Sequence, residues 1–396
     1  IWENNNMKIK NYIMEYIKHH AMVNNMFYTI GSAMVSTMNL LVKPDDHLIL
    51  FNSFGGKKYD DSPKAIYEFM KNDSRFAEYR LVWAFHEPEK YPEIIDKIKT
   101  DDFNYFLTAL KARVWITNSS IQRGLHFCGK HTYRFNSWHG TPMKQMGRDK
   151  KNTENAPRYR ANSDDVMLAQ SKYEIEKMSE ARQIPRERFK MFGLPRNDEL
   201  LGVTKEQVCA IRNMLGIPDG KKVILYAPTF REYMLDDLSQ CTLSVPIDFK
   251  NWHEILGDQF IVLFRAHYEV AKHTELPKDG NWLDVSTYPH LNELMMAADI
   301  LVSDYSSIFF DYSITEKPMF HFAYDYDEYN RKRGLYFDIR KELSGACVSN
   351  ELARLIATMD FENEVAKCRA FRDKYVEAYG TATQQSVEWI AKQLNL

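Results

Sequence analysis

This chain of 396 residues has no large excess of charge of one sign, no internal repeat and no low-complexity tract. Lysine and arginine total 52 against 54 aspartates and glutamates, which gives a net charge of −2, and no long basic run is present. Proteins that hold nucleic acid through its phosphates usually show such a run, so the sequence argues against a nucleic-acid binder of this class. Any anionic ligand must therefore be bound by a few local lysines and arginines.

Cysteine is scarce as well. The five cysteines are scattered, odd in number and without a Cys-x-x-Cys pair, at Cys128, Cys209, Cys241, Cys347 and Cys368. This pattern indicates neither a disulfide framework nor a zinc site. It favours a reducing cytoplasm, with all five as small core or surface residues.

One long uncharged stretch occurs near the start of the chain, over residues 21–42. Its length is that of a membrane span, yet seven polar residues interrupt it and its apolar positions follow helical spacing, which predicts an amphipathic helix. The preceding residues 8–18 combine a second apolar stripe with flanking lysines that could meet anionic lipid headgroups. We expect residues 1–45 to form an amphipathic helical segment that either associates with a membrane surface or packs on the domain.

From residue 47 onward, short apolar runs alternate with segments of helical periodicity. Such alternation predicts parallel sheets wrapped by helices, and the chain is too long for one ordinary core. We expect two α/β domains over residues 46–205 and 206–375, with a hinge near residues 197–205 and a closing helix within residues 376–396. The expected strands are residues 47–51, 79–84, 113–117, 165–169 and 189–192 in the first domain and residues 222–226, 260–264, 282–285, 300–303 and 319–322 in the second.

The run Ser-Asp-Tyr-Ser-Ser-Ile-Phe-Phe-Asp, at residues 303–311, joins one of these strands to a helix that we expect to begin at Ser306 or Ser307. A helix N-terminus offers unpaired N–H groups and the positive end of the helix dipole, so a nucleotide diphosphate could bind there. The two serines could donate hydroxyls to phosphate oxygens or could simply cap the helix. Asp304 and Asp311 could bind donor hydroxyls or could orient the turn.

A second cluster follows a strand-like segment and has the sequence Asn-Ser-Trp-His-Gly-Thr-Pro-Met-Lys over residues 136–144. It places His139 in a turn rather than on a core face, with a pKa range suited to proton transfer near neutral pH. Gly140 allows a close backbone approach, and Thr141 and Lys144 could meet phosphate oxygens. An ordinary surface histidine is the alternative interpretation.

A third cluster is the apolar strand at residues 260–264, which is followed by Arg265 and His267. A cation and an imidazole at the carboxyl end of a strand suit an anionic ligand. The strand over residues 222–226 is likewise followed by Thr229 and Arg231, a further candidate for phosphate binding. Since the carboxyl ends of parallel strands meet at one edge of a sheet, we expect these strand ends to converge on one cleft.

Together these motifs resemble the CDP-glycerol glycerophosphotransferase family, whose members build the poly(glycerol phosphate) chains of teichoic acids and some capsules. The resemblance extends from about residue 47 to about residue 340. It implies a GT-B fold, in which two Rossmann-like domains face a cleft. Met143 stands where family members often carry leucine. The matching segments are residues 59–64, 139–142, 193–198, 226–231, 265–268, 304–307 and 317–336.

The resemblance implies transfer of glycerol phosphate from CDP-glycerol to the terminal hydroxyl of a lipid-linked acceptor, with release of CMP and formation of a phosphodiester. It also implies a peripheral location on the cytoplasmic face of the cell membrane. We expect the second domain to hold the donor, and His139 in the first domain to remove the hydroxyl proton. His267 and Arg265 would neutralise charge on the phosphoryl oxygens and the leaving CMP. The other expected substrate-binding residues are Gly140, Thr141, Lys144, Thr229, Arg231, Asp304, Ser306, Ser307 and Asp311.

No dense acidic cluster of the kind that binds metal in other nucleotide-sugar enzymes is evident, so we expect no obligatory cofactor, although Mg²⁺ could assist. Three other functions stay open. The same enzyme could transfer ribitol phosphate from CDP-ribitol, a true glycosyltransferase could use a nucleotide sugar on the same fold, or the chain could be a membrane-bound scaffold without catalysis. The released product separates the enzyme classes, since a glycosyltransferase releases a nucleoside diphosphate instead of CMP.

Overall fold

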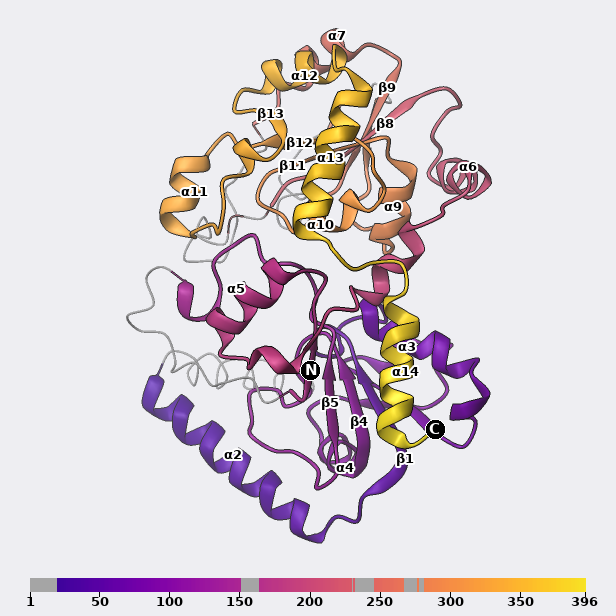
Figure 1. Ribbon diagram of the computed structural model, residues 1–396, viewed down its shortest axis with the longest axis vertical. Coiled ribbons are helices and arrows are strands. Elements are labelled where there is room, and N and C mark those ends of the chain that lie inside the picture. Colours follow the sequence, from indigo (N-terminus) through magenta and orange to yellow (C-terminus); the bar gives the residue numbers. More distant parts are fainter. Residues whose placement is uncertain (1–19, 151–163, 230, 232–245, 267–275, 278–280) are drawn as a thin grey trace, which may run out of the picture.

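The computed structural model describes residues 20–150, 164–229, 231, 246–266, 276–277 and 281–396. These residues form two α/β domains, which are the lower and upper lobes of Figure 1, and each domain is built on one parallel sheet. The two parallel α/β domains that the sequence predicts are thus confirmed.

The sheet of the first domain has seven strands in the order β3-β2-β1-β4-β5-β6-β7, and all neighbours are parallel. The chain order reverses between β1 and β4, at the middle of the sheet. The strands are β1 (Asp45–Asn52), β2 (Arg80–Phe85), β3 (Lys97–Lys99), β4 (Ala112–Thr117), β5 (Tyr133–Asn136), β6 (Val166–Leu168) and β7 (Phe189–Lys190). The helices are α2 (Ala21–Leu41), α3 (Asp61–Lys71), α4 (Phe103–Lys111) and α5 (Lys172–Arg182).

The sheet of the second domain has six strands in the order β10-β9-β8-β11-β12-β13, again all parallel, and its order reverses between β8 and β11. The strands are β8 (Lys222–Ala227), β9 (Phe260–Phe264), β10 (Trp282–Asp284), β11 (Ile300–Ser303), β12 (Met319–Phe322) and β13 (Ser344–Ala346). The helices are α6 (Lys205–Met214), α7 (Phe249–Leu256), α9 (Leu291–Ala297), α10 (Ile308–Ser313), α11 (Tyr326–Lys332), α12 (Ser349–Ala357) and α13 (Phe361–Tyr375).

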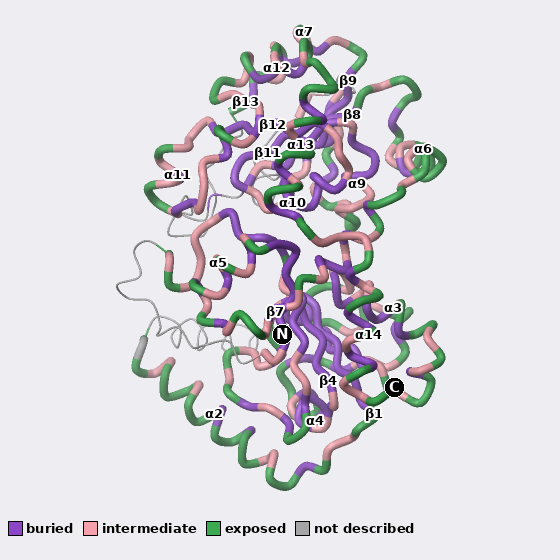
Figure 2. The backbone as a smooth tube through the Cα atoms, in the orientation of Figure 1, coloured by how far each residue is buried: buried purple, intermediate pink, exposed green. Residues whose placement is uncertain are grey.

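Strand β8 shows why the apolar runs of the sequence become central strands. Val223 and Leu225 enter the core on one face of the sheet, whereas Ile224 and Tyr226 enter the core on the other face. A parallel strand that helices cover on both faces must be apolar at successive positions. Figure 2 accordingly shows the strands of both sheets as buried stretches.

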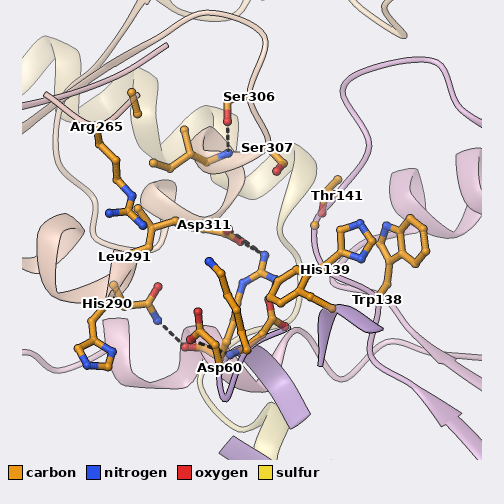
Figure 3. A pocket seen from close by; sticks show the side chains of 18 of the residues that line it. Asp60, Trp138, His139, Thr141, Arg265, His290, Leu291, Ser306, Ser307 and Asp311 are labelled. Carbon is orange, nitrogen blue, oxygen red and sulfur yellow. Dashed lines mark hydrogen bonds and ion pairs between the residues drawn. The ribbon is translucent and has the colours of Figure 1, made fainter. Parts of the chain in front are cut away.

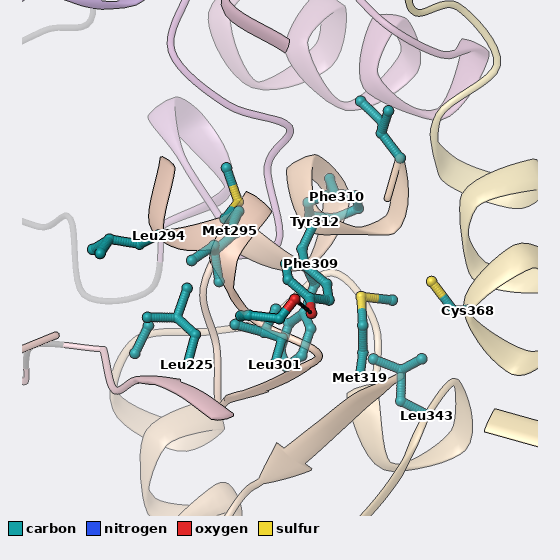
Figure 4. Packing of buried hydrophobic residues seen from close by; sticks show 14 of the residues in the cluster. Leu225, Leu294, Met295, Leu301, Phe309, Phe310, Tyr312, Met319, Leu343 and Cys368 are labelled. Carbon is teal, nitrogen blue, oxygen red and sulfur yellow. Dashed lines mark hydrogen bonds between the residues drawn. The ribbon is translucent and has the colours of Figure 1, made fainter. Parts of the chain in front are cut away.

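Helix α10 is anchored by its aromatic side chains. Phe309, Phe310 and Tyr312 are fully buried, and they join the same core as Leu225 and Leu301 of the sheet (Figure 4). A helix of 6 residues is too short to be stable alone, so this burial holds it. The turn that precedes α10 therefore has a fixed place at the end of β11.

The last helix of the chain returns to the first domain. After α13 the chain crosses back, and α14 (Ala382–Leu394) packs beside α3 (Figure 1). Ile390 enters the core of the first domain, and the ring centroid of Trp389 lies 5.8 Å from that of Phe135. Asp198, in the connection between the domains, accepts hydrogen bonds from two backbone N–H groups at the start of α14. The connection and the final helix thus support each other.

Helix α2 runs along the outside of the first domain (Figure 1). Its buried side includes Val35, and Asn39 donates a hydrogen bond of 2.8 Å to the carbonyl oxygen of Cys128. Helical spacing places a row of exposed apolar side chains on the opposite side, at Met22, Met26, Ile30, Met34 and Leu41. Residues 1–19 of the predicted amphipathic segment lie outside the described residues. No helix in the described ranges combines the length and the apolar character needed to cross a bilayer.

Candidate active site

A cavity of about 990 Å³ lies between the two domains. From the first domain it is lined by the turn after β1, by α3 and by the turn after β5. From the second domain it is lined by the turns after β8, β9 and β11 (Figure 3). In both sheets the strand order reverses beside these turns, which is where open α/β sheets bind their ligands.

His139 lies in the turn after β5 and lines the cavity (Figure 3). Its Nδ1 atom lies 2.7 Å from the backbone carbonyl oxygen of Asn118. Since a carbonyl oxygen can only accept, Nδ1 carries the proton and Nε2 is left with a lone pair. Burial lowers the pKa of the imidazole below its ordinary value, so the ring is neutral at pH 7. His139 is therefore prepared to accept a proton.

Two aromatic rings flank the His139 ring. The ring centroid of Trp138 lies 4.1 Å from that of His139, and the ring centroid of Phe54 lies 5.9 Å away. Arg182 adds a cation–π contact at 4.0 Å from the Trp138 ring. The side-chain oxygen of Asn118 accepts a hydrogen bond of 2.8 Å from the backbone N–H of Phe54. Asn118 thus fixes both His139 and one of the rings beside it.

Gly140 brings the His139 turn against the second domain. Its φ is 150°, and a Cβ atom at this position would lie 2.9 Å from the Oγ atom of Ser307. A larger residue would crowd the Ser307 side chain and would have to adopt a backbone conformation that favours glycine, which explains the glycine here. Further along the same turn, the backbone N–H of Gln145 donates a hydrogen bond of 3.0 Å to the carbonyl oxygen of Gly334 in the second domain.

The hydroxyl group of Thr141 is engaged by the protein. It donates a hydrogen bond of 3.0 Å to Oε2 of Glu174 and accepts one of 2.7 Å from the side chain of Gln170. Thr141 itself is buried, and so is Glu174. The sequence predicts Thr141 as a phosphate ligand, but its hydroxyl has one hydrogen to donate, and Glu174 accepts it. The role that this geometry supports is to fix the backbone next to His139.

Arg196 joins the two domains in the wall of the cavity. Its Nη1 atom lies 2.8 Å from Oδ2 of Asp61 in the first domain, and its Nη2 atom lies 2.9 Å from Oδ2 of Asp311 in the second. Asn197 donates a further hydrogen bond of 2.7 Å to Asp311. Asp311, which the sequence predicts as substrate-binding, lines the cavity but is occupied by these two partners. Its carboxylate therefore ties the domains together.

The turn before α10 forms the opposite wall. Ser307 is the N-cap residue of α10, and Oγ of Ser306 accepts a hydrogen bond of 3.3 Å from the backbone N–H of Ile308, the first residue of the helix. The hydroxyl of Ser307 has no hydrogen-bond partner among the described residues. Oγ1 of Thr229 also lacks one in that part of the chain, although Thr229 is buried and lines the cavity. Two hydroxyl groups of the second domain are thus available to an anionic ligand.

Arg231 and Asp304 occupy a different place from the one predicted, because neither lines the cavity. Arg231 is fully buried, and its guanidinium group lies 2.9 Å from Asp304 and 2.8 Å from Asp325. Asp304 also accepts a hydrogen bond of 2.9 Å from the backbone N–H of Thr229. Turning either side chain toward a ligand would leave a buried charge unpaired. The pair shapes the turns after β8 and β11 instead of contacting phosphate.

Arg265 and Lys144, which the sequence predicts as substrate-binding residues, both line the cavity. Arg265 donates hydrogen bonds of 3.0 Å and 2.6 Å from Nη1 to the carbonyl oxygens of Val285 and Tyr288. Burial lowers the pKa of its guanidinium group, and no carboxylate pairs with it among the described residues. His267, the second predicted catalytic residue, lies outside the described residues.

Acidic and basic side chains both line the cavity, but the acidic ones already accept hydrogen bonds from other groups of the protein. Each lining carboxylate accepts a hydrogen bond from the protein: Asp60, Asp61, Glu68, Asp198, Glu199, Glu293 and Asp311. Lys58, Lys64 and Arg265 line the same cavity without a carboxylate partner in the described ranges. No group of three or more His, Cys, Asp or Glu side chains among the described residues is placed to hold a metal ion. The arrangement suits an anionic ligand.

The sequence motifs do not predict several residues of the site. Trp138 and Arg196 lie inside motif segments, beside residues whose chemistry is more conspicuous, and this position is the signal that the sequence offers for them. Asn118 and Phe54 carry no such signal. They reach His139 because they follow β4 and β1, and in the sheet order β4 lies next to β5 and β1 lies next to β4.

The chain matches the model of the CDP-glycerol:poly(glycerophosphate) glycerophosphotransferase family over residues 34–392. It is 33% identical over 374 residues to the teichoic acid poly(glycerol phosphate) polymerase of Staphylococcus epidermidis, with 89% of this chain and 51% of that protein covered. It is 31% identical over 367 residues to the polymerase of the same name from Bacillus subtilis, with 87% and 48% covered. The chain thus spans about half the length of these polymerases.

A shorter relative is covered completely. The teichoic acid glycerol-phosphate transferase of Staphylococcus aureus is 30% identical over 407 residues, which is 97% of this chain and 100% of that protein. Among solved structures, the wall teichoic acid polymerase TagF superposes with a TM-score of 0.81 at 29% identity, with 99% of this chain and 98% of that chain covered. A TagF histidine variant soaked with CDPG superposes with a TM-score of 0.80.

Proposed function

The chain belongs to the CDP-glycerol:poly(glycerophosphate) glycerophosphotransferase family, and on that premise we propose that it transfers glycerol phosphate from CDP-glycerol to the terminal hydroxyl of a lipid-linked acceptor. The products are CMP and an acceptor lengthened by one phosphodiester. Glycerol is favoured over ribitol because the relatives matched over most of the chain carry glycerol phosphate in their names.

The observation that carries this proposal is the state of His139 in the cavity between the domains. Its Nδ1–H is held by the carbonyl oxygen of Asn118, so Nε2 is the base, and burial keeps the ring neutral. Across the cavity, Ser307 and Thr229 offer hydroxyl groups, and Arg265 offers a cation without a carboxylate partner among the described residues. A base therefore faces a wall suited to a diphosphate.

In the proposed reaction, Nε2 of His139 takes the proton of the acceptor's terminal hydroxyl. The hydroxyl oxygen attacks the phosphorus that bears the glycerol, and the bond between that phosphorus and the bridging oxygen of CMP breaks. CMP leaves with the electron pair of that bond. Ser307, Thr229 and Arg265 hold the diphosphate and stabilise the negative charge on the transferred group and on CMP. We propose that His267 also stabilises this negative charge, because it follows Arg265 and Ala266 directly in the sequence.

We infer that the transfer needs no tightly bound metal, while Mg²⁺ raises the rate by screening the diphosphate. The support is the set of cationic and hydroxyl groups around the cavity, which already matches a diphosphate. Turnover that survives dialysis against EDTA supports this inference. Complete loss of turnover in EDTA, with recovery on adding Mg²⁺, contradicts it.

The exposed apolar row of α2 provides the support for a peripheral location on the membrane that carries the acceptor. The helix has no charged residue, and Met22, Met34 and Leu41 are 85%, 65% and 90% exposed. Such an uncovered apolar stripe is rare on a free protein surface, whereas an interfacial helix buries it among lipid headgroups and acyl chains. Of the two faces of that membrane, we assign the cytoplasmic one.

Vesicle flotation tests this location. The double variant Met26→Glu/Ile30→Glu places two charges in the exposed row, and we expect it to bind anionic vesicles at least about tenfold more weakly than the parent protein. Met214→Glu, which changes a methionine on α6 that is 64% exposed, is the matched control and should bind as the parent does. Equal vesicle binding by all three proteins refutes a docking role for α2.

The transfer itself is tested by CMP release from CDP-glycerol and from CDP-ribitol, each offered with a short glycerol-phosphate acceptor. We expect release from CDP-glycerol and a loss of about 10²- to 10⁴-fold in His139→Ala, because the general base is gone. The control is His131→Ala, an exposed histidine of the same domain. Near-normal turnover by folded His139→Ala rules out the assigned base. Release of a nucleoside diphosphate from a nucleotide sugar, without CMP from either donor, would establish a glycosyltransferase instead.

A further inference from the structure

Two lysines in the first-domain wall of the cavity have no part in the reaction as proposed. Lys58 lies between β1 and α3, and Lys64 lies in the first turn of α3. Both line the cavity. The ammonium nitrogen of Lys58 lies 5.7 Å from the centroid of the Phe54 ring, and that of Lys64 lies 5.3 Å from the centroid of the Tyr59 ring.

The acids close to these lysines are engaged elsewhere. Glu68, one turn after Lys64 on the same helix, accepts a hydrogen bond from the hydroxyl of Tyr59. Asp61 is paired with Arg196, and Asp60 accepts the backbone N–H of Asp61. Neither lysine forms an ion pair within the described part of the chain. Their aromatic contacts leave the ammonium hydrogens able to bind an anion.

The position of Lys58 links it to the proposed base. The Phe54 ring that lies under its ammonium group also lies 5.9 Å from the His139 ring, so the lysine and the base flank one phenyl ring. The groups assigned to the donor diphosphate, namely Ser307, Thr229 and Arg265, come from the opposite wall. The cavity thus has cationic side chains on both walls. The donor diphosphate would contact the second-domain wall, which leaves the two lysines of the first-domain wall without an assigned ligand.

We propose that Lys58 and Lys64 form a second anion subsite, which binds the phosphodiester next to the terminal glycerol of the acceptor chain. When the terminal hydroxyl lies at His139, the phosphodiester that joins this glycerol to the chain lies one glycerol unit away, on the same wall. Binding it positions the hydroxyl for proton removal and selects an acceptor that already carries a polyol phosphate. The identity of the acceptor rests on the proposed function, whereas the lysine pair and its place in the cavity do not.

Isothermal titration calorimetry with a short glycerol-phosphate oligomer, without donor, tests the subsite directly. We expect the double variant Lys58→Ala/Lys64→Ala to bind the oligomer roughly tenfold more weakly than the parent protein, because two charge-assisted contacts at a partly exposed site are lost. Lys57→Ala removes an exposed neighbouring lysine that does not line the cavity, and it should bind as the parent does. Unchanged binding by the double variant, an equal loss in Lys57→Ala, or no binding by the parent protein each refutes the subsite.

Kinetics separate the subsite from the proposed function. In the double variant the KM for the acceptor should rise roughly tenfold, while the KM for CDP-glycerol stays the same. If the parent protein releases no CMP but still binds the oligomer through the two lysines, the proposed function fails and the subsite stands. If CMP release occurs with an unchanged acceptor KM in the double variant, the subsite fails and the proposed function stands. Circular dichroism and the thermal midpoint verify that each variant is folded.

Discussion

The two walls of the cavity are built differently. Behind the second-domain wall, Arg231 is enclosed by Asp304 and Asp325 and lies 5.0 Å from the Tyr305 ring, so its charge and both carboxylates are satisfied. Behind the first-domain wall, three buried polar atoms have no hydrogen-bond partner among the described residues: Nδ2 of Asn118, Oε1 of Gln170 and Oε1 of Glu174. The buried charges behind the second-domain wall are thus paired, whereas polar atoms buried behind the first-domain wall are left without partners in the described part of the chain.

The backbone shows the same difference. Phe54, Asp61 and Trp138, all of which line the first-domain wall, have φ values of 48°, 66° and 56°. Such left-handed conformations cost a non-glycine residue on the order of 1 kcal/mol or more, and they gather at functional sites. None of the described residues that the second domain contributes to the cavity has this conformation, glycine included. Strain is thus stored on the wall that carries His139.

This difference suits a division of labour between the domains. In the proposed reaction, the in-line displacement at phosphorus requires the donor to be held in one geometry, which a wall backed by paired buried charges and buried aromatic side chains provides. In the same proposal the acceptor grows at each transfer, so the wall that receives it benefits from contacts that are easily remade. Arg196 connects the two walls, because it forms an ion pair with Asp61 of the first domain and another with Asp311 of the second.

The largest effect is expected from breaking the buried pair behind the second-domain wall. Arg231→Met keeps an apolar side chain of similar length but takes the cation away from the buried carboxylate of Asp304 and removes one partner of Asp325. Leaving buried charges uncompensated costs about 3–5 kcal/mol. We expect the free energy of unfolding, measured by urea denaturation, to fall by that amount, with the second domain unfolding first.

The control for this variant is Arg340→Met. Arg340 makes the same kinds of contact at the surface, with Asp338 at 2.9 Å and with the Tyr326 ring at 3.6 Å. An exposed pair of this kind contributes about 0.2–1 kcal/mol, so the unfolding curve should barely move. A loss of equal size in the two variants would show that burial does not decide the contribution of Arg231, and the contrast between the walls would lose its energetic basis.

The sequence carries enough information for the sheets but not for the contacts between the walls. Strands such as β8 and β9 are apolar at successive positions, and the turn with Ser307 follows such a strand, β11. Arg196, by contrast, lies 135 residues from Asp61 and 115 from Asp311, so only the assembled domains bring the three together. An arginine placed after a strand can also face either way. The residues around Arg231 in the sequence do not indicate that its side chain points toward Asp304 in the interior and not toward the cavity.

A smaller and pH-dependent effect is expected behind the first-domain wall, at Glu174. Burial raises the pKa of this carboxyl group from its ordinary 4.5 to about 7, and the hydrogen bonds that Oε2 accepts from Gln170 and Thr141 offset only part of this rise. Oε1 has no partner among the described residues. Between pH 4.5 and 7 the folded protein keeps a proton that the unfolded chain has lost. The free energy of unfolding should therefore fall as pH rises through this window, by up to on the order of 3 kcal/mol, and then level off.

Glu174→Gln keeps the shape of this side chain and removes its titration. We expect urea denaturation between pH 4.5 and 8 to show a flatter dependence of the unfolding free energy on pH for this variant than for the parent protein, and higher stability relative to the parent above pH 7. Glu176→Gln, on the same helix and half-exposed, should keep the parent's slope. A slope that persists in Glu174→Gln would assign the proton to another group. In that case the unmade interactions behind His139 would not cost stability, and the first-domain wall would be as well satisfied as the second.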